Sequence, residues 1–418
     1  MSNQASLGDI SDGNDKVEEE SETSERTILG EIPDDWDSDI VENLFNLTNG
    51  SAREDRSSSR NTSETEGEFD VYGANGKIAK YEDSNLDKGL VVGRVGTVGS
   101  VYEIDQPAWV SDNAIKAKLD SDNNLRFLYY VMKRGRLDSL ANQTAHPLLN
   151  QGIVGSVRLP TPEKDEQRRI ASVLYNVDQA ISKTEEIIEQ TQRVKKGLMQ
   201  DLFEDIHGED SFPLEDAIED IRYGTDSKSN QDGDGVPTLR IPNIVGRKLT
   251  FDDLKHTSLS EDEREKLKVE EGDLLIIRTN GNPDYVGQTV VFPDTEEDYV
   301  FASYLIRIRV DQDKILPKFL SKYLNSEIGR REMNGWIRTS AGNYNLGITA
   351  IEKFSIPEVD EDKQRKVIDK IECVEEAIEK YKNEKEQLQR LKKGLMQDLL
   401  TGSVRTGEDV RVLDEVVV

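Results

Sequence analysis

Cysteine and histidine are nearly missing from this chain of 418 residues. Its one cysteine, Cys373, cannot form an internal disulfide and excludes a structural zinc site built from several cysteines. The three histidines leave little material for a histidine-ligated metal centre. We therefore expect neither a disulfide-stabilised scaffold nor a metal site, and no cofactor.

Long apolar runs are also absent. No segment approaches the ~20 apolar residues that a membrane span needs. The segment from Met1 to Glu20 is polar and acidic, unlike a secretion signal, in which an apolar run follows a basic start. These features predict a soluble, cytoplasmic protein that does not bind membranes.

Sequence motifs of the common enzymes are missing as well. There is no glycine-rich methyl-donor loop followed by Asn-Pro-Pro-aromatic, no Walker segment, and no Ser-His-Asp or zinc pattern. Gly93, Gly96 and Gly99 lack the spacing of a dinucleotide-binding loop and precede a strand pattern, which favours a tight hairpin turn. We expect a non-catalytic protein.

Acidic residues greatly outnumber basic ones: 83 against 54 gives a net charge of -29 and a pI near 4.6. Such a charge argues against nucleic acid as a partner, because both would be polyanions. The acids are nevertheless spread over ordinary apolar patterning, which is typical of adaptation to a cytoplasm at molar salt, where surface charges are screened within about 3 Å. Only residues 1–30, rich in Asp, Glu and Ser and free of aromatics, have the composition of a disordered segment.

An internal repeat organises the chain. The ten residues from Arg193 read RVKKGLMQDL and those from Arg390 read RLKKGLMQDL, an offset of 197. The same offset relates Gln167 to Gln364 and Pro160 to Pro357 without any insertion. The repeat is therefore a duplicated element of fixed length.

Apolar residues recur within each copy at steps of three and four, which predicts two amphipathic helices. We place them at residues 161–207 and 358–402, each about forty residues and roughly 60 Å long. Prolines stand at the entry to each helix and not in its interior. Each helix alone would expose its apolar stripe, so we expect the two to pair with each other.

A globular segment precedes each helix, at residues 31–160 and 208–357, and a tail follows at 403–418. The segments correspond: Gly89 to Arg94 parallels Gly272 to Arg278, a buried strand that ends in arginine, although the offset drifts between 184 and 195. An antiparallel helix pair separates the two globules, whereas a parallel pair makes them collide, and we favour the former. The predicted fold is α+β, with two mixed α/β globules separated by two long helices that form an antiparallel coiled coil.

This plan resembles that of the specificity subunit of Type I restriction-modification systems, over nearly the whole chain. The residues that carry the resemblance in the globules are Tyr72 to Gly76 (YGANG), Gly93 to Gly99 (GRVGTVG), Tyr223 to Thr225 with Lys228, Pro237 to Asn243 (PTLRIPN) and Gly272 to Arg278. Each globule exit also matches, at Leu159 to Pro162 and at Ile356-Pro357, as does KKGLMQDL at the end of each helix. The acidic surface departs from the usual charge balance of that family.

The resemblance implies a DNA reader without catalytic residues of its own. In that family each globule, a target-recognition domain, reads one half of a bipartite site in double-stranded DNA, and the helices fix the gap. The implied partners are methyltransferase (M) subunits and motor-nuclease (R) subunits.

Candidate DNA-binding residues lie in polar loops and at strand ends. Asparagine can pair with adenine, arginine with guanine or phosphate, and lysine with phosphate, but ordinary turn chemistry and structural ion pairs explain the same residues. The candidates in the first globule are Tyr72, Asn75, Lys77, Arg94, Thr144 and Asn150. Those in the second are Lys228, Arg278, Asn280, Asn282, Tyr285, Thr339, Asn343 and Asn345.

Two lysine pairs, Lys195-Lys196 and Lys392-Lys393, occur near the ends of the helices in near-identical surroundings. A solvated face that offsets the helix dipole explains them, as does a docking surface presented twice to identical partner subunits. A different class of function also remains open. An acidic coiled-coil scaffold, or a DNA-mimicking protein that binds only proteins, fits the charge.

Overall fold

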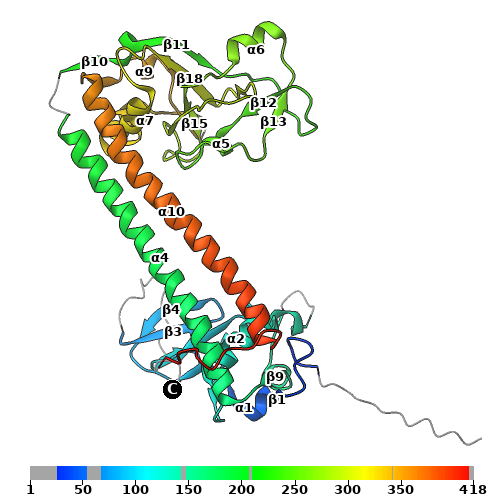
Figure 1. Ribbon diagram of the computed structural model, residues 1–418. Helices are drawn as coiled ribbons and strands as arrows, with labels where there is room; N and C mark the ends of the chain where they lie inside the picture. The colour runs from blue at the N-terminus through cyan, green and yellow to red at the C-terminus, as the bar shows by residue number, and fades with distance from the viewer. Residues whose placement is uncertain (1–25, 54–66, 143–146, 207–209, 341, 414–418) are drawn as a thin grey trace, which may run out of the picture. The chain divides into compact units, whose positions relative to one another are not determined.

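The computed structural model describes residues 26–53, 67–142, 147–206, 210–340 and 342–413. It divides into two compact units. Unit 1 comprises residues 1–182 and 386–418, and unit 2 comprises residues 183–385. Each unit holds one globular head and parts of both long helices (Figure 1).

Head 1 extends from β1 to β9 and is built on one antiparallel sheet and one mixed sheet. The larger sheet has the order β2-β8-β5-β6, a second has β4-β3-β7, and β1 pairs with β9. The elements are β1 (Asp37–Ile40), α1 (Val41–Leu44), β2 (Phe45–Asn49), β3 (Phe69–Gly73), β4 (Gly76–Tyr81), β5 (Gly89–Gly93), β6 (Val101–Ile104), β7 (Ala108–Val110), β8 (Ala114–Leu119), α2 (Leu125–Arg134), the 3₁₀ helix η1 (Leu137–Leu140), α3 (Gln151–Gly155) and β9 (Arg158–Thr161).

Head 2 extends from β10 to β21. Its sheets have the orders β11-β18-β14-β16, β13-β12-β17 and β15-β20-β19, and β10 pairs with β21. The elements are β10 (Ser211–Pro213), η2 (Leu214–Ala217), β11 (Ile218–Tyr223), β12 (Val236–Leu239), α5 (Ile241–Ile244), β13 (Lys255–Thr257), α6 (Glu261–Leu267), β14 (Leu274–Ile277), β15 (Thr279–Asn280), β16 (Thr289–Val291), β17 (Val300–Phe301), β18 (Leu305–Val310), α7 (Pro317–Asn325), α8 (Glu327–Trp336), β19 (Arg338–Ser340), β20 (Asn343–Asn345), α9 (Ile348–Ile351) and β21 (Ser355–Pro357).

The two heads have the same topology. Taken in the order across the sheet, β2, β8, β5 and β6 of head 1 occupy the places of β11, β18, β14 and β16 in head 2. In both heads the second sheet combines one antiparallel and one parallel pairing, and a short antiparallel pair closes the head. The correspondence predicted between the strands before Arg94 and Arg278 is confirmed, because these strands are β5 and β14. The mixed α/β heads expected from the sequence are likewise present.

The long helices are α4 (Lys164–Glu204) and α10 (Glu361–Leu400), and both units show them running antiparallel. In unit 1, Asp178 of α4 forms an ion pair with Lys392 of α10. In unit 2, Lys195 Nζ lies 2.7 Å from Glu375 Oε1, and Lys385 Nζ lies 2.9 Å from Glu185 Oε1. As the number of one partner rises, that of the other falls by the same amount, as an antiparallel register requires.

Apolar packing fixes each head to the start of one long helix and the end of the other. In unit 1, Ile170 and Leu174 of α4 join Leu399 and Leu400 of α10 in the core of head 1. In unit 2, Phe203 of α4 is fully buried with Val367, Ile368 and Ile371 of α10 in the core of head 2. The helix seam and the head cores are thus continuous within each unit.

A buried glutamine ties each head to the first turns of its helix. Gln167 Oε1 accepts a hydrogen bond from the backbone N–H of Asn124 (2.8 Å), just before α2, and its Nε2 donates to the Pro162 carbonyl (2.8 Å). Gln364 Oε1 accepts from the Leu316 N–H (2.7 Å), just before α7, and its Nε2 donates to the Val359 carbonyl (3.0 Å). The repeat recognised at these glutamines is therefore a repeated anchoring contact.

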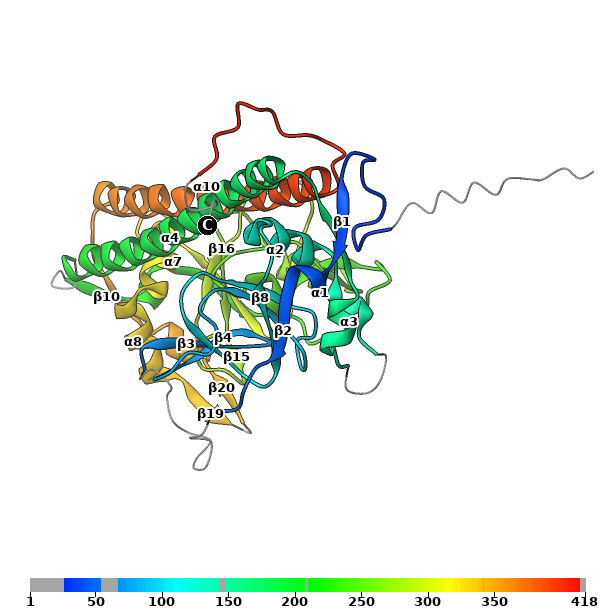
Figure 2. The same cartoon turned by 90° about the horizontal axis from the view of Figure 1, so that it is seen from below.

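The described part of the N-terminus and the C-terminal tail both pack on head 1. The segment predicted to be disordered, residues 1–30, lies outside the described residues up to residue 25; beyond it, Ile28 and Leu29 pack against the head 1 core. After α10, Arg405 contacts Asp35 (2.9 Å) and Glu166 (3.2 Å). Figure 2 shows this tail, in red, leaving α10 beside β1 and turning back toward α4.

Two further features follow from the described residues alone. No helix among them is long and apolar enough to cross a membrane. Nor do three or more of their His, Cys, Asp or Glu side chains gather in a way that could hold a metal ion.

Replacing Gln167 by alanine tests the anchoring contact. The change leaves the buried N–H of Asn124 without its acceptor, so we expect the unfolding free energy of unit 1 to fall by about 1–3 kcal/mol in urea denaturation. Gln179→Ala, an exposed position on the same helix and in the same unit, is the control and should change it by less than about 0.5 kcal/mol. Equal effects of the two substitutions would show that the contact contributes nothing.

Candidate nucleic-acid interface

Equivalent hairpins carry Arg94 and Arg278. In head 1, β5 and β6 pair antiparallel around residues 94–100, and in head 2, β14 and β16 pair around residues 278–288. The glycine that closes each loop has a positive φ, +77° at Gly99 and +84° at Gly287, and donates its N–H to the last residue of the preceding strand. The predicted hairpin turn is confirmed. The second loop is longer than the first, so the equivalent hairpins carry loops of different length.

The two arginines make the same set of hydrogen bonds. The Arg94 N–H donates to the Asn113 carbonyl (3.0 Å), its own carbonyl accepts from the Leu149 N–H (3.1 Å), and its Nη1 donates to the Asp112 carbonyl (3.4 Å). Arg278 repeats these bonds with Tyr304 (3.0 Å), Leu346 (2.8 Å) and Ser303 (3.3 Å). In the described part of the chain neither arginine pairs with a carboxylate, and the buried Nε of each lacks a hydrogen-bond partner.

A close approach of two backbone segments completes the frame in each head. A Cβ added at Gly50 would lie 2.0 Å from the Ser111 carbonyl oxygen, and one at Gly224 would lie 2.4 Å from that of Ala302. The next residue donates its N–H across the gap, from Ser51 to Val110 and from Thr225 to Phe301, each at 2.9 Å. Glycine is required at both positions because any side chain would force these segments apart. We call Gly50, Arg94, Leu149 and residues 110–114, and their equivalents in head 2, the arginine frame.

Sequence reasoning identified the arginines but missed their partners. The repeated contacts alone show which partners are equivalent in the two heads. The equivalent pairs are Gly50 and Gly224, Asn113 and Tyr304, and Leu149 and Leu346. Their spacing from the arginines differs between the heads, so a search at one offset does not find them. The sequence signal that could have found the first of these partners is the glycine that directly follows β2 and β11, Gly50 and Gly224.

Two other candidates of head 1, Tyr72 and Asn75, contact residues of this frame or of the loop after Arg94. Asn75 accepts a hydrogen bond from Thr97 in the β5–β6 loop, and Tyr72 lies beside Tyr102, with 6.4 Å between the ring centroids. Lys77 is paired with Asp70 at 2.8 Å, and this hydrogen bond raises the pKa of the lysine. Burial raises the pKa of the half-buried Tyr72, and Asp70 adds to the effect.

Asn150 has a structural task in the same cluster. Its Oδ1 accepts from the Ile153 N–H at 2.8 Å and thereby caps α3. Thr144, the remaining candidate of head 1, lies outside the described residues.

In head 2, four candidates come together in one small sheet. Asn280 of β15 pairs with β20, which holds Asn343 and Asn345, and β20 pairs with β19, which holds Thr339. Thr339 and Asn343 are exposed, whereas Asn345 is half-buried and donates to the Asn343 carbonyl at 3.2 Å. This sheet adjoins the frame, since Leu346 follows β20 directly.

The loop after Arg278 is shaped by turn chemistry. Asn280 Oδ1 accepts from the Asn282 N–H (2.8 Å), and Asn282 Oδ1 accepts from the Asp284 N–H (2.9 Å). Tyr285 is half-buried against the core of head 2. Lys228, four residues after Gly224, is exposed. The Arg278 guanidinium itself lies 4.5 Å from the ring centroid of Tyr223.

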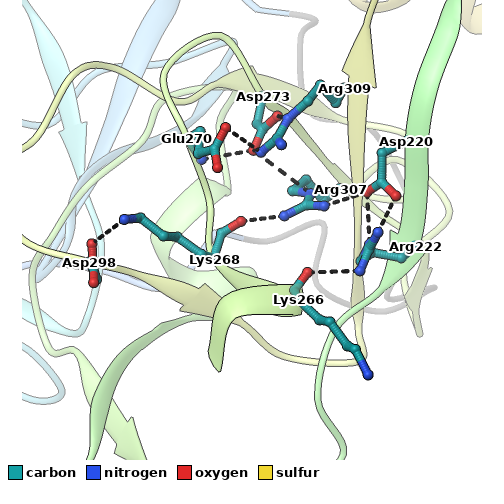
Figure 3. Close-up of polar contacts among 9 residues, drawn as sticks. All are labelled: Asp220, Arg222, Lys266, Lys268, Glu270, Asp273, Asp298, Arg307 and Arg309. Carbon is teal, nitrogen blue, oxygen red and sulfur yellow. Dashed lines mark hydrogen bonds and ion pairs between the residues drawn. The ribbon is translucent and has the colours of Figure 1, made fainter. Parts of the chain in front are cut away.

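Three other arginines of head 2, Arg222, Arg307 and Arg309, are already paired with carboxylates. Figure 3 shows a network on β11 and β18 in which Arg222 Nε donates to Asp220 (2.7 Å) and Arg309 Nε donates to Asp273 (2.8 Å). Arg307, only 3 % exposed, bonds to Asp220 and to the Lys268 carbonyl. These arginines hold the segment after α6 against the sheet and are not available to phosphate.

The candidate partner-binding lysines divide into two kinds. Lys195 and Lys392, at equivalent repeat positions, form the ion pairs between α4 and α10 described above. Lys196 is exposed and pairs with Glu327 at 2.8 Å, and Lys393 is exposed. Beside them, Val194 and Leu391 are apolar and 60 % and 51 % exposed.

The network around Asp220 predicts a pH-dependent stability. Hydrogen bonding from Arg222, reinforced by Arg307, lowers the pKa of Asp220 below the ordinary 3.8. A lowered folded-state pKa means that the stabilisation is complete above pH ~4 and is lost as the pH falls through the folded value.

Asp220→Asn should therefore lower the unfolding free energy of unit 2 by about 1–3 kcal/mol at pH 7, because Arg307 loses a charged partner while buried. The deficit should shrink as the pH falls below 4, which denaturant titrations at pH 7 and pH 3 can measure. A deficit that is the same at both pH values would contradict this assignment.

Comparison with known proteins agrees with this architecture. The profile of the Type I restriction modification DNA specificity domain matches residues 33–193, from just before β1 through most of α4. The chain is 26% identical over 316 residues to the Type I restriction enzyme MjaVIII specificity subunit of Methanocaldococcus jannaschii, covering 69% of this chain and 73% of that one. It is 23% identical to the putative MjaX specificity subunit of the same organism, over 92% and 97% of the two chains.

The fold has a solved counterpart. The crystal structure of the Type-I restriction-modification system S subunit from M. genitalium superposes with a TM-score of 0.58 at 19% identity, covering 88% of this chain and 96% of that one. In sequence and in fold the chain is similar to Type I specificity subunits. In this chain the matched domain comprises one head with its exit helix, and the topology repeats that combination once more in residues 211–400.

Proposed function

We propose that this chain is the non-catalytic DNA reader of a Type I restriction-modification complex. Each head binds one half of a bipartite target in double-stranded DNA, and α4 with α10 sets the gap between the halves. The observation that carries the proposal is the arginine frame, which recurs bond for bond in both heads while the loops on it differ. A shared arginine frame that carries different loops suits two heads that each recognise a different DNA half-site.

On this proposal, some candidate side chains contact bases and others contact phosphate. Those at the frame and in the β15-β20-β19 sheet lie next to the bases, and exposed cations such as Lys228 contact phosphate. With a net charge of -29 the chain gains less than other readers from phosphate contacts, so the partner subunits supply part of the affinity. The isolated chain accordingly binds duplex DNA weakly.

Methylome sequencing of cells that carry the complete system tests the proposed function. The expected result is one methylated motif with two specified halves and an unspecified gap of constant length. Binding of the assembled complex to a duplex with that motif, measured at high salt, should exceed binding to a duplex with either half replaced. A chain that binds only proteins, as an acidic scaffold or DNA mimic does, would give no motif and no such preference.

Methyltransferase subunits dock, on this proposal, on the surfaces formed by Val194 with Lys196 and by Leu391 with Lys393. Exposed apolar side chains on a helix, flanked by cations and present twice, suit two copies of one partner. Motor-nuclease subunits then join the assembled methyltransferase. Lys195 and Lys392 contribute indirectly, because they hold the helices together.

Substitution on these surfaces separates docking from stability. Val194→Asp with Leu391→Asp should weaken methyltransferase binding by roughly tenfold or more while leaving the unfolding midpoint unchanged, because both side chains are exposed. Lys195→Ala with Lys392→Ala should instead lower the midpoint. Calorimetric titration with the methyltransferase subunit and thermal unfolding measure the two effects. Unchanged methyltransferase affinity of the aspartate variant would contradict the docking proposal.

A further inference from the structure

The arginine frame holds one four-residue turn in each head. Residues 111–114 connect β7 to β8, and the Ala114 N–H donates to the Ser111 carbonyl at 3.1 Å. Residues 302–305 connect β17 to β18 in the same way, with the Leu305 N–H donating to the Ala302 carbonyl at 2.9 Å. The two turns are equivalent because β7 and β8 correspond to β17 and β18 in the sheet orders.

The arginine fixes both carbonyls at the centre of its turn. In head 1, Arg94 donates from its side chain to Asp112 and from its backbone to Asn113. In head 2, Arg278 does the same to Ser303 and Tyr304. The glycine opposite, Gly50 or Gly224, lets the neighbouring strand lie against the start of the turn. The third residue of each turn is therefore held rigidly.

The side chain at that third position is exposed and differs between the heads. It is Asn113 in head 1 and Tyr304 in head 2, where the tyrosine is 57 % exposed. Neither side chain forms a hydrogen bond within the described part of the chain. An exposed tyrosine on a rigid turn has no packing task in the head that displays it.

The asparagines predicted from the sequence contrast with this pair. Asn75, Asn150, Asn280 and Asn282 each use a side-chain oxygen to accept a hydrogen bond from a neighbouring loop, turn or helix end. They shape the surface, whereas Asn113 and Tyr304 are displayed by it.

We propose that Asn113 and Tyr304 are specificity-determining residues, each contacting a base of the half-site that its own head reads. This inference rests on the proposed function and names residues that neither the sequence nor the comparisons assign. The amide of Asn113 has the donor and acceptor that pair with adenine in the major groove. The ring of Tyr304 can stack on a base or contact a thymine methyl group, and its hydroxyl can donate or accept.

The frame explains why these positions suit recognition. A turn clamped by an arginine loses little freedom on binding, so a side chain on it is already oriented for the base. Arg94 and Arg278 act as positioning residues through that turn. Because the backbone bonds are the same, the residue at the third position can change without changing the fold of the head.

A double-mutant cycle between side chain and half-site tests the proposal. The complex is assembled with its methyltransferase subunits, and its affinity is measured for the wild-type duplex and for duplexes with either half replaced. In wild type, replacing each half lowers affinity. In the Asn113→Ala variant, the loss of affinity caused by replacing one half of the duplex site should shrink by roughly 10- to 100-fold. The loss of affinity caused by replacing the other half should stay the same. Tyr304→Ala should show the reverse pattern.

Controls separate recognition from folding and from the proposed function. Asn46→Ala, an exposed asparagine of β2 on the same head, should leave both losses unchanged. Tyr304→Phe keeps the ring and reports whether the hydroxyl is read. Arg94→Lys should reduce discrimination only in the half-site that Asn113 reads, and should add nothing to Asn113→Ala.

Two results have distinct meanings. If wild type prefers its bipartite duplex but Asn113→Ala and Tyr304→Ala keep both losses, the inference is wrong and the proposed function stands. If wild type itself shows no preference for either half, the proposed function fails.

Discussion

The structure depends on the apolar seam between α4 and α10. Each helix alone would expose apolar side chains such as those of Ile170, Leu174 and Ile371 to water. Pairing removes the free-energy cost of that exposure. Because the same cores continue into the heads, each head is completed by one helix start and one helix end. A change in the length of either helix would shift the seam out of register, which explains why the helical repeat tolerates no insertion while the heads do.

The two heads share one arrangement of backbone hydrogen bonds but differ in the side chains that this arrangement exposes. The arginine frame is held by backbone groups, two glycine close approaches and the guanidinium of Arg94 or Arg278. None of these contacts depends on the identity of the exposed residues, so loops of different length and turns with different side chains are accommodated. Head 2 uses this freedom most, since it adds α6, α8 and the β15-β20-β19 sheet.

The sequence predicted the architecture better than the surface. Helix periodicity and the constant offset predicted the paired α4 and α10, because both features can be read within a single continuous stretch of sequence. Gln167 and Gln364 were recognised as a repeat, but their role was not, because it depends on Asn124 and Leu316 in another segment. Asn113 and Tyr304 escaped because the offset between equivalent residues changes along the heads, and because an asparagine in a turn carries no signal of its own. Of the asparagines predicted from the sequence, Asn150 caps a helix, and Asn280 and Asn282 shape a turn.

On the proposed function, the acidity of the chain limits how it can bind DNA. Phosphate attraction is weak for a chain with a net charge of -29, and in head 2 several arginines are already bound to carboxylates. Recognition then rests on rigidly displayed side chains more than on charge. The most direct test is a structure of the assembled complex on its target duplex. The account predicts Asn113 and Tyr304 against base edges of different half-sites; finding either turn facing solvent or protein, with DNA held elsewhere on the heads, would contradict it.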